Sequence, residues 1–302
     1  MLTNFLALFG LLGIFLLAIN IKSFGINYNK LFIILIFLPS IFIYTSIIGK
    51  DAITFFGINL FITGINNRLK LNFKYRILFC LLSLTLIFFI RAWVSYILIL
   101  SLLSMIIYYL VFLTKSIFFK YVFFLSIILF CLILYNYNFV EIIINNAGKG
   151  YSNIQIKNFI NFFVNFQNNF IIPERMGKNG LFVLFFRDIS DFLYFYSKGL
   201  FATLFRPMLF LDNNSFFMII AGVQNFILFI VFLYSICFRT RNLITSFKDP
   251  LYIFCLTYII IFSILYCVII YMNFGTGLRY QIQILPITII LIAILLDKNY
   301  AR

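Results

Sequence analysis

Long apolar runs, separated by short polar turns that carry most of the charges, set the pattern of this 302-residue chain. Runs of about 17 to 22 apolar residues have the length that a helix needs to cross the hydrocarbon core of a membrane, and a helix crosses it without leaving backbone polar groups unpaired. Such runs lie near residues 4–20, 31–48, 52–65, 77–90, 94–113, 121–140, 216–236, 251–272 and 280–296. The third and fourth of these runs are short for full spans. We therefore predict an all-α polytopic membrane protein with about nine transmembrane helices.

The long connection at residues 141–215 has a different pattern. Residues 151–172 place apolar side chains on one helical face and asparagines mostly on the other, which predicts an amphipathic helix in the membrane interface. The apolar stretch 181–205 is interrupted by charges, so we expect it to be interfacial or half-inserted. The chain thus divides into an N-terminal bundle (1–140), an external loop, and C-terminal transmembrane helices (216–302).

Composition supports the membrane assignment and removes several classes of chemistry. Hydrophobic residues make up 64% of the chain and charged residues only 10%, with a mean hydropathy of +1.11. The 21% aromatic content accompanies abundant Ile, Asn and Lys and is most simply a bias of an AT-rich genome. The net charge of +15 is scattered between apolar runs, so we expect no nucleic-acid partner.

The chain contains no histidine, which excludes His-based acid/base catalysis, Ser/His/Asp triads and histidine-ligated metals. Its five cysteines lie in or beside apolar runs without a CxxC pair, so we interpret them as small buried hydrophobes. We expect neither a metal nor a cofactor. The N-terminus lacks a basic region and a small-residue cleavage motif, so the first run is expected to remain as a membrane helix.

The distribution of Lys and Arg predicts that the N-terminus is outside and the C-terminus inside. In this orientation thirteen of the 23 basic residues fall inside, and seven others lie in the long external connection, which counts little in this rule. The three that remain, Lys50, Arg91 and Arg279, all fall in short loops on the external side. Each alone has an ordinary interfacial explanation, but three exceptions on one face favour a functional role.

The segment NFGTGLRYQIQILP, residues 273–286, is the most informative of these exceptions. We expect a turn in which Gly275 and Gly277 bring backbone amides and the Arg279 guanidinium close to a ligand. An arginine fork donates two parallel hydrogen bonds and suits a phosphate. The candidate phosphate-binding or substrate-binding residues are Lys50, Arg91, Arg187, Arg206 and Arg279.

External carboxylates are candidates for a general base that would accept a proton from an acceptor hydroxyl. The candidate catalytic residues are Asp51, Asp188 and Asp191. Arg187 and Asp191 are four residues apart, a spacing at which they can pair on one helical face. Each of these charges also has a topological or structural explanation.

Several short motifs carry a resemblance. They are Leu38-Pro39-Ser40, Gly49-Lys50-Asp51-Ala52, Arg91, Phe205-Arg206-Pro207, Gln224-Asn225, Lys248-Asp249-Pro250 and NFGTGLRYQIQILP. Together they resemble bacterial membrane proteins of surface-polysaccharide assembly. The arginine-then-proline opening of the last helix is similar to O-antigen polymerases and to GT-C glycosyltransferases, which use polyprenyl-phosphate-linked sugars.

The resemblance implies a multi-pass protein of the bacterial cytoplasmic (inner) membrane that transfers or polymerises polyprenyl-linked sugars on the outer face, in the synthesis of O-antigen or exopolysaccharide. Its partners would be membrane lipid, a polyprenyl-(di)phosphate-linked glycan and other polysaccharide-assembly proteins. One departure is clear: GT-C enzymes carry an acidic residue in the first external loop, and no residue here matches it. The chain is therefore either a short relative without that base or a protein with a different reaction. The alternatives are a non-enzymatic transporter or flippase of lipid-linked glycan, and a structural subunit of the assembly machinery.

Overall fold

The computed structural model describes residues 2–26, 38–47, 49–113, 189–208, 216–237, 243, 245–272 and 274–297. All regular elements in these ranges are helical, so the predicted all-α class is confirmed for the part of the chain they cover. The elements are α1 (Leu2–Lys22), α3 (Pro39–Ile47), α4 (Gly49–Ile65), η1 (Asn67–Leu69), α5 (Phe73–Tyr108), η2 (Tyr109–Leu113), α9 (Ile189–Phe205), α10 (Phe216–Cys237), α12 (Pro250–Met272) and α13 (Phe274–Leu296).

Three helical stretches are long and apolar enough to cross a membrane. They are Phe73–Val111, Met218–Cys237 and Gly277–Leu296, and shorter apolar helices cover Ala7–Lys22 and Pro250–Tyr266. Large apolar side chains remain exposed on the outer faces of α5 and α10, among them Phe89 and Ile227. Such faces suit a lipid environment. The predicted run 121–140, the interfacial helix 151–172 and the connection as far as residue 188 lie outside the described residues.

The two predicted runs 77–90 and 94–113 form one element with a sharp reversal at Arg91. Arg91 has non-helical backbone angles (φ −148°, ψ 78°). The Ser95 hydroxyl donates a hydrogen bond to the Leu84 carbonyl at 3.3 Å, although eleven residues of straight helix would separate them by about 16 Å. The two halves of α5 therefore fold back on each other, as the predicted turn at this point requires.

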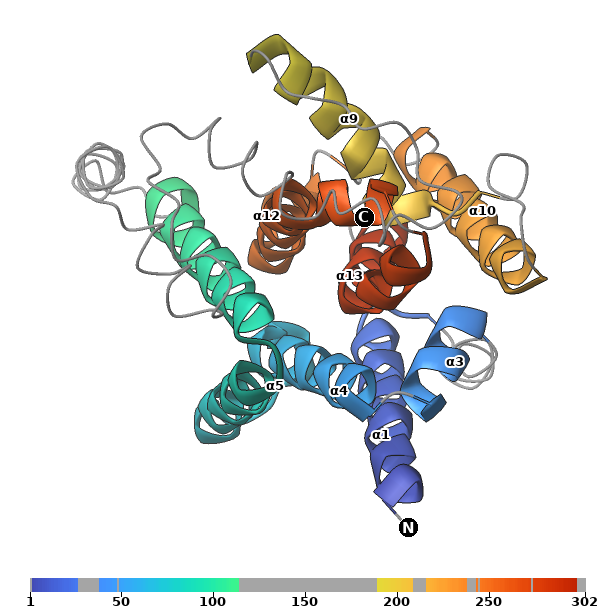
Figure 1. The fold of residues 1–302 in the computed structure, drawn as a ribbon. Coiled ribbons are helices and arrows are strands. Elements are labelled where there is room, and N and C mark those ends of the chain that lie inside the picture. Colours follow the sequence, from blue (N-terminus) through green and yellow to red (C-terminus); the bar gives the residue numbers. More distant parts are fainter. Residues whose placement is uncertain are drawn as a thin grey trace, which may run out of the picture.

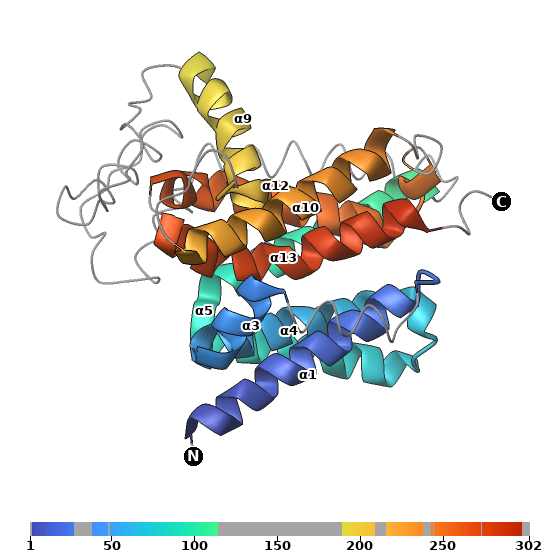
Figure 2. The same cartoon turned by 90° about the vertical axis from the view of Figure 1, so that its right-hand side faces the viewer.

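The helices form two layers (Figures 1 and 2). One layer contains α1, α3, α4 and the first half of α5, and the other contains α10, α12, α13 and the second half of α5, with α9 rising steeply from it. The Ser104 and Thr257 hydroxyls, 2.9 Å apart, join the returning half of α5 to α12. One continuous apolar core spans both layers.

Helix α4 lies at the centre of this packing. All of its residues are buried except Gly49, Lys50, Ile53 and Phe56. Small residues allow its close contact with α5: a Cβ added at Gly64 would lie 2.9 Å from the Arg76 carbonyl oxygen. Arg76 in turn donates to the carbonyls of Gly64 and Ile65 at 3.0 and 3.2 Å, and so satisfies the end of α4.

The last helix begins earlier than the sequence predicts. α13 starts at Phe274, so Gly275, Gly277 and Arg279 lie in its first two turns and do not form the expected turn. In apolar surroundings a helix is favoured because it pairs the backbone groups of this segment internally. This gain outweighs the low helix propensity of the two glycines. Arg279 is therefore presented from a helix, with a fixed direction. Pro286 lies inside the same helix.

Candidate anion-binding site

Asp51 is the centre of an ion-pair cluster at one end of the bundle. It lies in the first turn of α4, where the helix dipole favours a negative charge, and its side chain is fully buried. Its Oδ1 pairs with Arg91 from the reversal in α5, and its Oδ2 accepts a hydrogen bond from Arg279 Nε on α13 at 2.7 Å. We call Asp51, Arg91 and Arg279 the Asp51 cluster. It joins three helices from both layers.

Arg91 is the enclosed member of the cluster. Its side chain is 15% exposed, and its guanidinium carbon lies 5.2 Å from the centre of the Tyr280 ring, within the range of a cation–π contact. Tyr280 packs against Tyr266 with ring centres 4.9 Å apart. The aromatic rings and the Asp51 carboxylate thus fix Arg91 in place.

Arg279 is the accessible member of the cluster, because its side chain is 40% exposed. Within the described residues, the hydrogen bond that its side chain makes uses Nε. The two terminal amino groups, which form the outer fork of a guanidinium, remain available for another acceptor. Exposed Lys50 precedes Asp51 in α4. Among the described side chains, Lys50, Arg91 and Arg279 together with Asp51 carry a net positive charge, which suits an anion.

The geometry gives Asp51 a different role from that of a general base. A base must reach the proton that it removes, and it needs an unoccupied oxygen to do so. Asp51 is fully buried and both of its oxygens face guanidinium groups. In this arrangement it orients the two arginines, and we describe it as a positioning residue.

The remaining candidate residues from the sequence analysis are not members of the Asp51 cluster. Arg206 follows α9, close to the end of α13 that carries Arg279: the neighbouring Leu204 carbonyl accepts a hydrogen bond from Gln281 Nε2 at 3.0 Å. Arg187 and Asp188 lie outside the described residues. Asp191 is in the first turn of α9, and its side chain is not described. The described ranges contain no group of three or more His, Cys, Asp or Glu side chains that could hold a metal.

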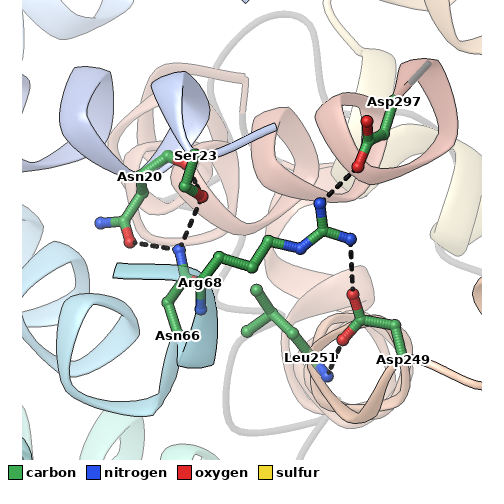
Figure 3. Close-up of polar contacts among 7 residues, drawn as sticks. All are labelled: Asn20, Ser23, Asn66, Arg68, Asp249, Leu251 and Asp297. Atoms are coloured by element: carbon green, nitrogen blue, oxygen red, sulfur yellow. Dashed lines mark hydrogen bonds and ion pairs between the residues drawn. The ribbon is translucent and has the colours of Figure 1, made fainter. Parts of the chain in front are cut away.

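A second ion-pair cluster lies at the opposite end of α4 and α13, and sequence reasoning missed it. Arg68 pairs with Asp297 at the end of α13 and, at 3.3 Å, with Asp249 at the start of α12 (Figure 3). Asp249 Oδ1 also accepts a hydrogen bond from the Leu251 amide at 2.9 Å, so it caps α12 ahead of Pro250. Arg68 is one of the thirteen basic residues that the positive-inside rule places inside, which by itself indicates only a topological role. We call Arg68, Asp249 and Asp297 the Arg68 cluster.

Buried amides link the short motifs that the sequence analysis singled out. Gln224 Oε1 accepts a hydrogen bond from the Ser40 amide at 2.9 Å, which joins α10 to the start of α3. Asn225 and Gln281 bond each other through their side chains at 3.3 Å, and Asn225 also donates to the Pro207 carbonyl at 3.3 Å. These polar residues therefore meet at the contacts between α3, α9, α10 and α13.

Comparisons of this chain with family models, with curated proteins and with solved structures found no match. Functional inference therefore depends on the geometry of the site.

Proposed function

We propose that this protein binds the phosphate of a polyprenyl-linked sugar at the Asp51 cluster, and that it transfers or polymerises such sugars on the outer face of the bacterial cytoplasmic membrane. The observation that carries the proposal is the geometry of Arg279: its Nε bonds a fully buried carboxylate, while the side chain is 40% exposed and its two terminal amino groups make no hydrogen bond among the described residues. A guanidinium oriented by this hydrogen bond has lost part of its rotamer freedom before the ligand arrives, which favours binding.

The apolar surroundings support a ligand that is itself partly embedded in lipid. Arg279 lies near the start of a helix whose following residues are apolar and long enough to cross a membrane. A phosphate attached to a polyprenyl chain places its charge near the membrane surface and its hydrocarbon in the bilayer. Arginine forks and a nearby lysine would stabilise the negative charge that develops on a departing phosphate.

The function is tested by polymer formation in cells that carry Arg279→Ala. We expect loss of polymer with normal protein level and membrane insertion, because the exposed fork is removed. Arg279→Lys should restore part of the activity, since lysine keeps the charge but supplies no planar fork. The matched control is Lys74→Ala, which removes an exposed positive charge near the start of α5, at the end of the bundle that carries the Arg68 cluster.

Each alternative predicts a different result. A structural subunit would tolerate Arg279→Ala without loss of polymer. A transporter or flippase would show normal sugar transfer in permeabilised cells, together with a loss of lipid-linked glycan from the outer leaflet. Normal polymer in the Arg279→Ala strain would overturn the proposal.

A further inference from the structure

Gln283 is a buried amide without a hydrogen-bond partner. Its side chain is fully buried, and neither Nε2 nor Oε1 has a hydrogen-bond partner among the described residues. Leaving a buried polar group unpaired destabilises the folded state, and folded proteins keep few such groups. A polar group from outside the described residues, such as a bound ligand, would satisfy the amide.

Gln283 lies directly below the Asp51 cluster. It follows Arg279 by four residues in α13, so the two side chains share one face of the helix, one turn apart. On the α12 side, the Tyr258 hydroxyl donates to the Gln283 carbonyl at 3.3 Å. The same face of α12 continues through stacked Phe262 and Tyr266 toward Tyr280. The unpaired amide therefore lies between the two layers, beneath the arginines.

Pro286 gives α13 a point at which it can bend. A proline inside a helix lacks the N–H that would bond the carbonyl four residues earlier, here that of Ile282, and such positions are where helices kink. The part of α13 before Pro286 carries both Arg279 and Gln283. The part after it ends at Asp297, which the Arg68 cluster holds.

The Asp51 cluster and the Arg68 cluster hold the two layers together at opposite ends, and the Asp51 cluster does so more weakly. At one end, Arg279 is 40% exposed, so water can replace its contact with Asp51 at modest cost. At the other end, Arg68 is 26% exposed and bonds two carboxylates, one of which is fully buried. Opening at the Asp51 end, with Pro286 as the hinge, breaks the single ion pair of Arg279, whereas opening at the other end breaks both ion pairs of Arg68.

We propose that Gln283 is the floor of a binding site for a neutral, hydroxyl-bearing group, and that the Asp51–Arg279 contact closes this site. An uncharged amide offers two donors and one acceptor, which match hydroxyl groups better than ions. The identification of these hydroxyls as those of a sugar rests on the proposed function; the closure and the hinge do not.

The closure is tested by labelling with a membrane-impermeant maleimide. The Gln283→Cys variant is prepared in the full chain after replacement of the five native cysteines, and it is labelled in membrane vesicles of both orientations. Combination with Arg279→Gln, which leaves Arg91 paired with Asp51, should raise the labelling rate at least about tenfold from one side of the membrane. Adding Pro286→Ala should remove most of that increase, because the straight helix regains its backbone bond.

The matched control is Thr288→Cys. Thr288 is also buried, but it lies on a different face of α13, where its hydroxyl bonds the Ile284 carbonyl at 3.1 Å. Selective labelling at position 283 supports the closure. Equal labelling at both positions means general loosening and overturns it, as does the absence of labelling at both. A rate that Pro286→Ala leaves unchanged overturns the hinge.

The ligand class is tested on a Gln283→Cys protein that carries Arg279→Lys in place of Arg279→Gln, because lysine keeps a positive charge in the cluster. A polyprenyl diphosphate that carries a disaccharide should slow labelling, whereas the same polyprenyl diphosphate without sugar should not. If neither lipid binds the parent protein, the proposed function fails while the labelling result for the closure stands. If the sugar-bearing lipid binds but leaves labelling unchanged, the sugar site at Gln283 is refuted and the phosphate site is retained.

Discussion

Replacing Asp51 with asparagine removes the charge at the centre of the Asp51 cluster while keeping the size of the side chain. Asparagine keeps one oxygen for Arg91 or Arg279, but its amino group then faces the other guanidinium, so a donor meets a donor. Two guanidiniums also lose their common counter-charge. The variant therefore tests whether burial of this carboxylate determines how much each pair contributes to stability.

The exposed fractions set the expected order of the effects. Breaking a buried ion pair by removing one partner costs about 3–5 kcal/mol, whereas an exposed pair contributes about 0–1 kcal/mol. Arg91 is 15% exposed and Arg279 is 40% exposed, and Asp51 is fully buried. We expect Asp51→Asn to cost about 3–4 kcal/mol, Arg91→Gln somewhat less, and Arg279→Gln about 1 kcal/mol, because Arg91 still neutralises Asp51 in the last variant.

The assay is chemical denaturation of the purified proteins in one detergent, with Lys74→Gln as the control for loss of an exposed charge. Double variants extend the test: Asp51→Asn combined with Arg91→Gln should cost less than the sum of the single changes, because both remove one interaction. A cost for Arg279→Gln equal to that of Asp51→Asn would refute the reasoning from burial. Additive effects of Asp51→Asn and Arg91→Gln would refute the pairing.

Two further predictions concern packing and the opposite end of the bundle. Gly64→Ala should destabilise the protein by about 1–3 kcal/mol in the same denaturation assay, because the new Cβ would lie 2.9 Å from a backbone oxygen of α5. At Gly57 the atoms close to a new Cβ belong to the Ile87 side chain. Ile87→Ala should therefore reduce the destabilisation that Gly57→Ala causes. Arg68→Gln should destabilise the protein more than Lys74→Gln, since it removes the guanidinium paired with the fully buried Asp297. Arg68→Lys should recover part of the lost stability. Equal effects of Arg68→Gln and Lys74→Gln would contradict this prediction.

The apolar pattern was sufficient to predict several helices of the described part. The predicted runs 4–20 and 251–272 correspond to α1 (Leu2–Lys22) and α12 (Pro250–Met272), because uninterrupted apolar residues leave a helix as the only way to pair the backbone. The reversal at Arg91 was predicted from a charged residue between two apolar runs. The start of α13 was missed, because two glycines within three residues favour a turn when local propensity alone is considered.

The pairings within the candidate site could not be predicted. Sequence patterns placed Lys50, Arg91 and Arg279 on one side, but Arg279 and Asp51 are 228 residues apart, and their contact follows from how α4 and α13 pack. Burial also changed the role assigned to Asp51. From the sequence alone a carboxylate is a candidate base, but in the structure both oxygens of Asp51 face arginines. Gln283 lies in the segment 273–286, but the sequence pattern indicated no role of its own for it, because only the packed structure shows that its buried amide has no partner among the described residues.

The affinity of the purified protein for a polyprenyl diphosphate, measured in lipid nanodiscs, tests the central claim most directly. Hydrogen bonds to charged groups contribute about 1.5–3 kcal/mol, so Arg279→Gln should weaken binding roughly tenfold to a hundredfold, while Lys74→Gln should leave it nearly unchanged. Unchanged affinity in Arg279→Gln, or an equal loss in both variants, would contradict a specific phosphate site at the Asp51 cluster.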